Sequence, residues 1–139
     1  MQATDRRPQP RKPLTIFLAD DNPDSIITLA ALLRDEGHVV LTCANARIAL
    51  QAIRQQQPDV CILDIKMPGK SGYELAREIR ESKLSPMPVL IAISGHFKRP
   101  SEQLVARASG FDHFFPKGTS EPAELLALLA TLGNSPSAA

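Results

Sequence analysis

Residues 60–72 have the sequence VCILDIKMPGKSG, a short apolar run that ends at an aspartate and is followed by a loop. The four apolar residues 60–63 lack polar alternation, which predicts a strand that is covered on both faces. Asp64 lies at the carboxyl end of this strand. Residues 73–81 then carry apolar side chains at helical spacing, so the segment predicts a strand, a loop and a helix.

The same alternation continues in both directions along the chain. The expected strands are residues 14–19, 39–43, 60–63, 89–93 and 113–115. The expected helices are residues 23–36, 46–56, 73–81, 101–108 and 121–132, and the first of them has Asn22 as its cap and Pro23 at its first position. Five such units predict an α/β fold, a doubly wound (βα)5 flavodoxin-like three-layer sandwich with parallel strand order 2-1-3-4-5.

Length and charge limit the organisation of the chain. Its 139 residues are 43% hydrophobic, which is enough for one domain with a packed core. We expect this domain at residues 14–132, between a disordered basic arm at 1–13 and a disordered tail at 133–139. The arm has four basic residues against one aspartate, so the formal net charge of +1 leaves the remainder slightly acidic. This balance favours neither nucleic acid nor membrane as a partner.

Cysteine usage and hydropathy indicate the compartment. Cys43 and Cys61 each lie in an apolar run that predicts a buried strand, so we expect two buried free thiols. The apolar run at residues 14–19 is too short for a signal peptide or a membrane span. These features predict a cytoplasmic protein.

Polar residues follow four of the predicted strands. Asp20 and Asp21 come after the first strand, Asp64 after the third, Ser94 after the fourth and Lys117 after the fifth. In a doubly wound sheet these positions open on the same edge, where such folds bind ligands. Because the first and third strands are neighbours, we expect the three carboxylates to converge.

Crowded carboxylates repel one another, so protons or a cation must relieve the repulsion. Carboxylate oxygens together with water and a backbone carbonyl suit Mg²⁺ or Mn²⁺. The Ser94 hydroxyl and the Lys117 ammonium would complete a pocket for a phosphoryl group. An aspartate can be the nucleophile that forms an aspartyl phosphate, and Asp64 is the central candidate.

Four segments together resemble the receiver domain of two-component response regulators, of the stand-alone chemotaxis type or the phosphorelay type. They are DIKMPGKSG at residues 64–72, LADDN at 18–22, ISG at 93–95 and GFDHFFPK at 110–117. The resemblance covers about residues 14–132. It implies a signalling domain that catalyses only its own phosphoryl transfer and dephosphorylation.

The resemblance implies a role for each residue of the acidic site. Asp64 would accept a phosphoryl group from a histidine kinase or a phosphotransfer protein. Asp21 and Asp64 would ligate Mg²⁺ together with the backbone carbonyl of Lys66, and Asp20 would contribute, often through water. Lys117 would pair with a phosphoryl oxygen.

The resemblance also implies a route for the signal. Ser94 would move toward the phosphoryl group, and Phe114 would turn inward as the switch aromatic. A downstream protein would then recognise the face formed by residues 101–108, 113–115 and 121–132. Lys66 and His96 would flank the pocket and tune the lifetime of the phosphate. Only seven residues follow residue 132, too few for an output domain, so we expect a lone regulator or a phosphorelay intermediate, and a piece of a hybrid kinase stays an open alternative.

Two positions depart from the family pattern. Gly118 replaces the proline that usually follows the lysine, and we expect a trans Lys117–Gly118 bond because a cis bond here would cost about 2.5–4 kcal/mol. Pro116 precedes the lysine instead. The switch aromatic is Phe114 rather than tyrosine, so any signal that uses its hydroxyl is absent.

Three other functions are alternatives to a phosphorylated receiver. A haloacid-dehalogenase-type phosphatase needs Asp-x-Asp after the first strand, but Asn22 takes the place of the second aspartate. A flavodoxin-like FMN carrier needs a phosphate-binding loop rich in Ser, Thr and Gly, whereas this chain has Asp-Asp-Asn-Pro-Asp. A receiver that binds partners without being phosphorylated stays open at this point.

Overall fold

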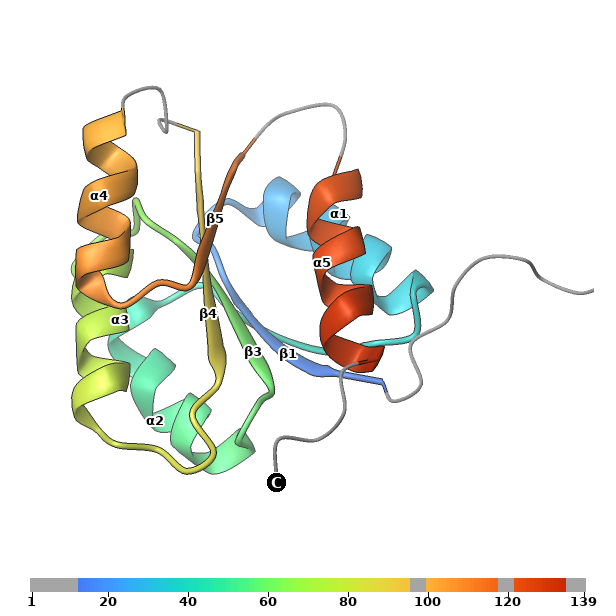
Figure 1. The fold of residues 1–139 in the computed structure, drawn as a ribbon, viewed down its shortest axis with the longest axis horizontal. Helices are drawn as coiled ribbons and strands as arrows, with labels where there is room; N and C mark the ends of the chain where they lie inside the picture. Colours follow the sequence, from blue (N-terminus) through green and yellow to red (C-terminus); the bar gives the residue numbers. More distant parts are fainter. Residues whose placement is uncertain (1–12, 96–99, 118–121, 135–139) are drawn as a thin grey trace, which may run out of the picture.

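The computed structural model describes residues 13–95, 100–117 and 122–134. In these parts of the chain a parallel sheet is flanked by helices, one after each strand (Figure 1). The strands are β1 Thr15–Ala19, β2 Val39–Cys43, β3 Val60–Asp64, β4 Val89–Ser94 and β5 His113–Pro116. The helices are α1 Pro23–Asp35, α2 Ala46–Gln56, α3 Gly72–Glu81, α4 Pro100–Ser109 and α5 Ala123–Asn134. The strand order β2-β1-β3-β4-β5 confirms the predicted topology.

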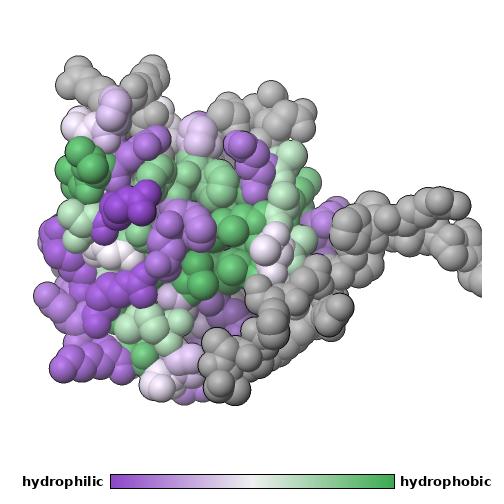
Figure 2. All heavy atoms as spheres, in the orientation of Figure 1, coloured by the Kyte–Doolittle hydropathy of each residue, from purple (hydrophilic) through white to green (hydrophobic). Residues whose placement is uncertain are grey.

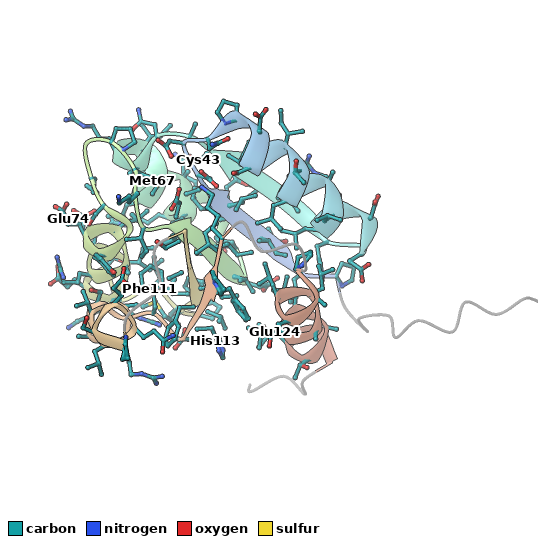
Figure 3. All side chains as sticks on the ribbon, turned by 90° about the horizontal axis from the view of Figure 1, so that it is seen from above. Cys43, Met67, Glu74, Phe111, His113 and Glu124 are labelled. Atoms are coloured by element: carbon teal, nitrogen blue, oxygen red, sulfur yellow. The ribbon has the colours of Figure 1, made fainter. Side chains whose placement is uncertain are left out.

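The sheet separates two hydrophobic cores, because successive side chains of a strand point to opposite faces. Ile16 and Leu18 of β1 pack with α1 and α5 on one face. Phe17 and Ala19 pack with α2, α3 and α4 on the other face, and Figure 3 shows these two helical layers with the sheet between them. Burying a side chain such as Phe17 stabilises the fold by about 1.5–3 kcal/mol. The strands therefore lack polar alternation because both faces are covered.

Several helices begin where their capping residues allow. The Asn22 side chain accepts a hydrogen bond from the Ser25 amide at the start of α1, as predicted. Helix α3 begins at Gly72, one residue before the predicted start, because Ser71 and Glu74 form a capping box. Helix α4 begins at Pro100 rather than at residue 101, since proline suits the first helical position.

The last βα unit also differs slightly from the expectation. Strand β5 extends to Pro116, which pairs with Ser94 of β4. Helix α5 begins at Ala123 and continues to Asn134, and residue 121, the predicted start, lies outside the described residues. The predicted arm at residues 1–13 and the tail at 133–139 lie almost wholly outside them too, so their disorder stays a prediction.

Both cysteines are buried free thiols, as predicted from the apolar runs that contain them. Burial raises the pKa of the Cys61 thiol, which keeps it protonated. Figure 2 shows hydrophilic residues over most of the α3–α4 side of the view and hydrophobic residues between β5 and α5. None of the described helices is long and apolar enough to span a membrane.

A clamp around Arg80 holds β5 beside β4. The Arg80 guanidinium donates hydrogen bonds to the carbonyl of Gly110 and to the Asp112 carboxylate, which also accepts the Leu90 amide at 2.9 Å. Gly110 has φ +116, and a Cβ there would lie 2.8 Å from the Arg80 Cγ. Glycine is therefore required at this turn, which leads into β5, the strand that directly precedes Lys117.

His38 is buried at the opposite end of the sheet from the acidic residues. Its Nδ1 accepts a hydrogen bond from the Leu14 amide at 3.2 Å, so this nitrogen carries no proton in the folded protein. Burial lowers the pKa of His38 below its usual value, although the charge of Glu36 opposes the shift. The unfolded chain consequently binds a proton at a higher pH than the folded chain does.

We predict that His38 makes the protein less stable in mild acid. The contribution of neutral His38 is fully present above the unfolded pKa of about 6.5 and decreases as the pH falls from there toward the lower folded pKa. Urea denaturation of the wild type and of His38→Asn at pH values of about 7.5 and 5.5 checks this, because asparagine keeps the acceptor without titrating. The loss should be smaller in the variant, and equal losses would contradict the assignment.

Candidate functional site

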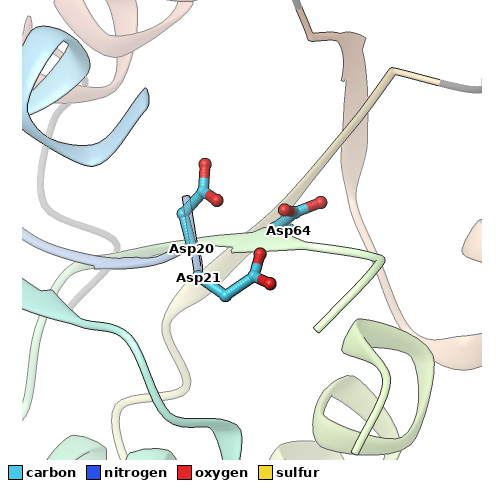
Figure 4. A group of neighbouring side chains, drawn as sticks. All are labelled: Asp20, Asp21 and Asp64. Carbon is cyan, nitrogen blue, oxygen red and sulfur yellow. The ribbon is translucent and has the colours of Figure 1, made fainter. Parts of the chain in front are cut away.

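Three carboxylates meet at the carboxyl end of the sheet. Asp20 and Asp21 directly follow β1, and Asp64 is the last residue of the adjacent strand β3. One oxygen from each lies within 4.8 Å of the others. Figure 4 shows the three carboxylates grouped together, with those of Asp21 and Asp64 extending to the same side. The expected convergence of the three aspartates is present.

Lys117 supplies a positive charge to this group. Its Nζ lies 3.0 and 2.9 Å from the two oxygens of Asp20 and 2.9 Å from Oδ2 of Asp64. The Lys117 amide donates to the carbonyl of Ser94 at 2.7 Å, which fixes the backbone where β5 ends. The lysine thus points into the site, bridging aspartates from 97 and 53 residues away in the sequence.

Burial and charge oppose one another at this bridge. Asp20 and Asp64 are 2% and 3% exposed. Burial raises the pKa of the Asp64 carboxyl, the Lys117 hydrogen bond lowers it, and the charge of Asp20 raises it again, with a net increase. For Lys117, burial lowers the pKa, but its bonds to both aspartates outweigh that effect and raise it overall. The bonds to both aspartates therefore favour the charged form of Lys117, whereas burial and the charge of Asp20 outweigh the effect of Lys117 on Asp64.

Asp21 is exposed and lines a cavity together with Asp64 and Lys117. This cavity has a volume of about 490 Å³. Its lining joins the ends of β1, β3, β4 and β5 and consists of Asp21, Asn22, Pro23, Asp64, Lys66, Ser94, Gly95 and Lys117. Most of the residues that the sequence analysis singled out therefore share one cavity. Gly118 and His96, with the Lys117–Gly118 bond, lie outside the described residues.

The loop after Asp64 is fixed by two close contacts. The Lys66 amide donates a hydrogen bond to Oδ1 of Asp64 at 3.2 Å. The Gly72 amide donates to the carbonyl of Ile65 at 2.9 Å, and a Cβ on Gly72 would lie only 2.5 Å from the Asp64 carbonyl oxygen. A side chain at residue 72 would push the backbone of Asp64 away. Gly72, the last residue of the segment DIKMPGKSG, thus allows α3 to begin close to the backbone of Asp64.

Ser94 and Phe114 lie on the same side of the sheet. Ser94 is buried at the end of β4, and Phe114 of β5 pairs with Ala92, two residues before it. Phe114 is half-buried against the core beneath α4. The guanidinium of Arg107 on α4 lies over its ring, with Cζ 5.7 Å from the ring centroid, a contact that the sequence analysis missed. No periodicity in the sequence identifies that pairing.

The donor set fits a divalent cation. Three carboxylates within 4.8 Å of one another provide the hard oxygen ligands that Mg²⁺ and Mn²⁺ prefer. Asp21 has no ion pair among the residues that the structure describes, and it faces the same cavity as Asp64. Lys117 balances only part of the negative charge, so an additional cation is electrostatically favoured.

Fold and site together define a doubly wound α/β domain with an acidic pocket at the carboxyl edge of its sheet. The family model for the response regulator receiver domain matches residues 16–130. The chain therefore belongs to the response regulator receiver domain family. Receiver domains are components of two-component signalling, are typically phosphorylated on an aspartate and interact with histidine kinases or phosphotransfer proteins.

Relatives in sequence include proteins of similar length. The uncharacterized 14.6 kDa protein in the sodA1 3′ region of Leptolyngbya boryana is 31% identical over 116 residues, which cover 84% of this chain and 87% of that protein. The protein PilH of Pseudomonas aeruginosa is 29% identical over 118 residues, covering 84% and 96%. The match to the sensor histidine kinase GacS of Pseudomonas protegens is 32% identical but covers only 12% of the kinase.

Solved structures agree with this assignment. A putative response regulator from Chloroflexus aurantiacus superposes with a TM-score of 0.80 at 27% identity, covering 89% of this chain and 100% of that one. The receiver domain of a sensor histidine kinase from Pseudomonas aeruginosa PAO1 has a TM-score of 0.78 at 25% identity, covering 88% and 99%. That crystal structure has a magnesium ion coordinated in the active site cleft.

We predict that Lys117→Met destabilises the fold by about 1–3 kcal/mol near neutral pH, because it leaves Asp20 and Asp64 buried without their counter-charge. Lys66→Met is the matched control, since Lys66 lines the cavity but is exposed and its side chain has no ion pair among the described residues. Urea denaturation of both variants without divalent cations measures the difference. Equal stability of the two variants would show that the bridge contributes nothing.

Proposed function

We propose that this chain is a phosphorylation-dependent switch whose phosphoacceptor is Asp64. The observation that supports it best is the position of Asp64, which is the terminal residue of a central strand, faces a cavity and is held by Lys117 at 2.9 Å. Membership in a family that is typically phosphorylated on aspartate supports the same reading. The donor would be the phosphohistidine of a histidine kinase or phosphotransfer protein.

In the proposed transfer, a carboxylate oxygen of Asp64 forms a bond to phosphorus while the P–N bond to the donor imidazole breaks. The Lys66 amide and Lys117 orient the Asp64 carboxylate before attack. The Lys117 ammonium and the Ser94 hydroxyl then provide donors for the phosphoryl oxygens. The domain thereby catalyses only its own phosphorylation and dephosphorylation.

The cation would be held by Asp21 and Asp64, with the Lys66 backbone carbonyl and a contribution from Asp20. When bound, Mg²⁺ or Mn²⁺ supplies charge neutralisation for the phosphoryl oxygens. The exposed Asp21 gives the ion access from solvent, whereas the buried Asp20 keeps Lys117 in place.

The buried free thiols of Cys43 and Cys61 are consistent with a reducing compartment, so the proposed location of the protein is the cytoplasm.

The proposed phosphoacceptor predicts a specific mass change. Wild-type protein incubated with acetyl phosphate and Mg²⁺ should gain one phosphoryl group by intact-mass measurement, and Asp64→Asn should gain none because the nucleophilic carboxylate is absent. Asp35→Asn, which removes an exposed carboxylate at the end of α1, is the matched control and should be phosphorylated like the wild type. Phosphorylation of Asp64→Asn at the wild-type level would exclude Asp64 as the acceptor.

The proposed cation site predicts that Mg²⁺ stabilises the folded protein. A ligand that binds only the folded state raises the melting temperature with concentration. Asp21→Asn should reduce this increase, because it replaces a charged carboxylate ligand with a neutral amide without disturbing the Lys117 bridge. Thermal denaturation over a range of Mg²⁺ concentrations measures it, with Asp35→Asn as the control. An unchanged response in Asp21→Asn would remove that residue from the ligand set.

The proposed output surface is the α4–β5–α5 face. Ser94 and Phe114 connect the cavity to this face, and Phe114 packs beneath α4. Phosphorylation should therefore shift amide NMR signals of α4 and β5 more than those of α1 beyond its first turn. Asp64→Asn treated with acetyl phosphate is the control, because any signal that shifts in this variant does so without phosphorylation of Asp64. Shifts confined to the loops around the cavity would indicate a phosphate shuttle instead of a conformational switch.

A further inference from the structure

A second cavity lies on the other side of the sheet from Ser94 and Phe114. It has a volume of about 630 Å³ and is bordered by α1, α5 and the ends of β4 and β5. That volume falls within the range of cavities that bury small organic molecules. The lining residues include five large apolar side chains, Leu29, Leu32, Ile93, Phe115 and Leu125.

The apolar wall is incompletely covered by the protein itself. Leu29, Leu32 and Phe115 are only half-buried, and Leu29 and Phe115 pack against the core between the sheet and α1 and α5. A molecule in the cavity would remove this apolar surface from water, which favours binding. The cavity thus offers an apolar binding surface that none of the described side chains fills.

The charge at the rim is negative. Asp24 in the first turn of α1 and Glu124 in the first turn of α5 both line the cavity and are exposed. Neither forms an ion pair with a residue in the described parts of the chain. Lys117 also lines the cavity, but its ammonium is bound to Asp20 and Asp64. These two exposed carboxylates favour a cation and disfavour an anion.

We propose that this cavity is a binding site for a cationic amphiphile, a small molecule with an apolar body and a protonated amine. The body would lie against Leu29, Leu32 and Phe115, and the amine would face Asp24 and Glu124. Because Lys117 lines this cavity and the phosphorylation cavity, the ligand would contact the residue that bridges Asp20 and Asp64. An effect of the ligand on phosphorylation through Lys117 rests on the proposed function. The binding of the ligand to the cavity does not.

A series of three isosteric probes tests the site: 4-phenylbutylamine, 4-phenylbutanol and 4-phenylbutyrate. Amide NMR titration of the full chain should show the amine shifting signals of α1 and α5, with an affinity at least about tenfold higher than that of the carboxylate. The alcohol should bind with intermediate affinity, since it has the same body without charge. Equal affinities, no binding at millimolar concentration, or shifts confined to α4 would overturn the proposal.

Two sets of variants separate the contribution of the ligand's apolar body to binding from that of its charge. Leu29→Trp fills the cavity and should abolish binding of the amine, whereas Leu104→Trp on the exposed face of α4 should not. Asp24→Asn combined with Glu124→Gln should reduce the preference for the amine over the alcohol to about onefold while leaving alcohol binding intact. Unchanged binding in Leu29→Trp, or an unchanged preference in the double variant, would each contradict the assignment.

The dependence on phosphorylation is tested separately. If wild-type protein binds the amine but is not phosphorylated, the proposed function fails and the binding site stands. If it is phosphorylated but does not bind the amine, the binding site fails alone.

Discussion

The structure depends on the balance between two buried carboxylates and one ammonium. Asp20 and Asp64 are almost fully buried because β1 and β3 are adjacent in the centre of the sheet, and Lys117 reaches both from the end of β5. Buried charges of like sign would destabilise the fold without this partner. The bridge consequently requires the strand order, the Arg80 clamp that holds β5 and the close approach of Gly72 to the backbone of Asp64.

Much of the architecture follows from local patterns. Unbroken apolar runs at the strands, Asn22 and Pro23 at the start of α1, and chain order predict the sheet and the convergence of the aspartates. Other features arise only from packing. The sequence does not show which member of the Asp20–Asp21 pair is buried, and the structure buries Asp20 against Lys117 while Asp21 faces the cavity. The contact of Arg107 with Phe114 and the cavity between α1 and α5 likewise depend on tertiary neighbours.

Lys117 joins the two sides of the sheet. It lines the cavity that contains Asp64 and Ser94, and also the apolar cavity beneath α1 and α5. A change in the partners of Lys117 would therefore affect both cavities. If its ammonium left Asp20 and Asp64, the repulsion between the two carboxylates would no longer be balanced. Through Lys117, the proposed phosphorylation of Asp64 would therefore be linked to the cavity between α1 and α5 on the other face of the sheet.

The central claim is that Asp64 receives the phosphoryl group. Its most direct test is site mapping: protein treated with acetyl phosphate and Mg²⁺ is reduced with borohydride, which converts an aspartyl phosphate to homoserine, and the digest is sequenced by mass spectrometry. If Asp64 is the phosphoacceptor, homoserine should be found at position 64 and at no other aspartate. Homoserine at position 20 or 21, or its absence from a sample that carries phosphate, would contradict it.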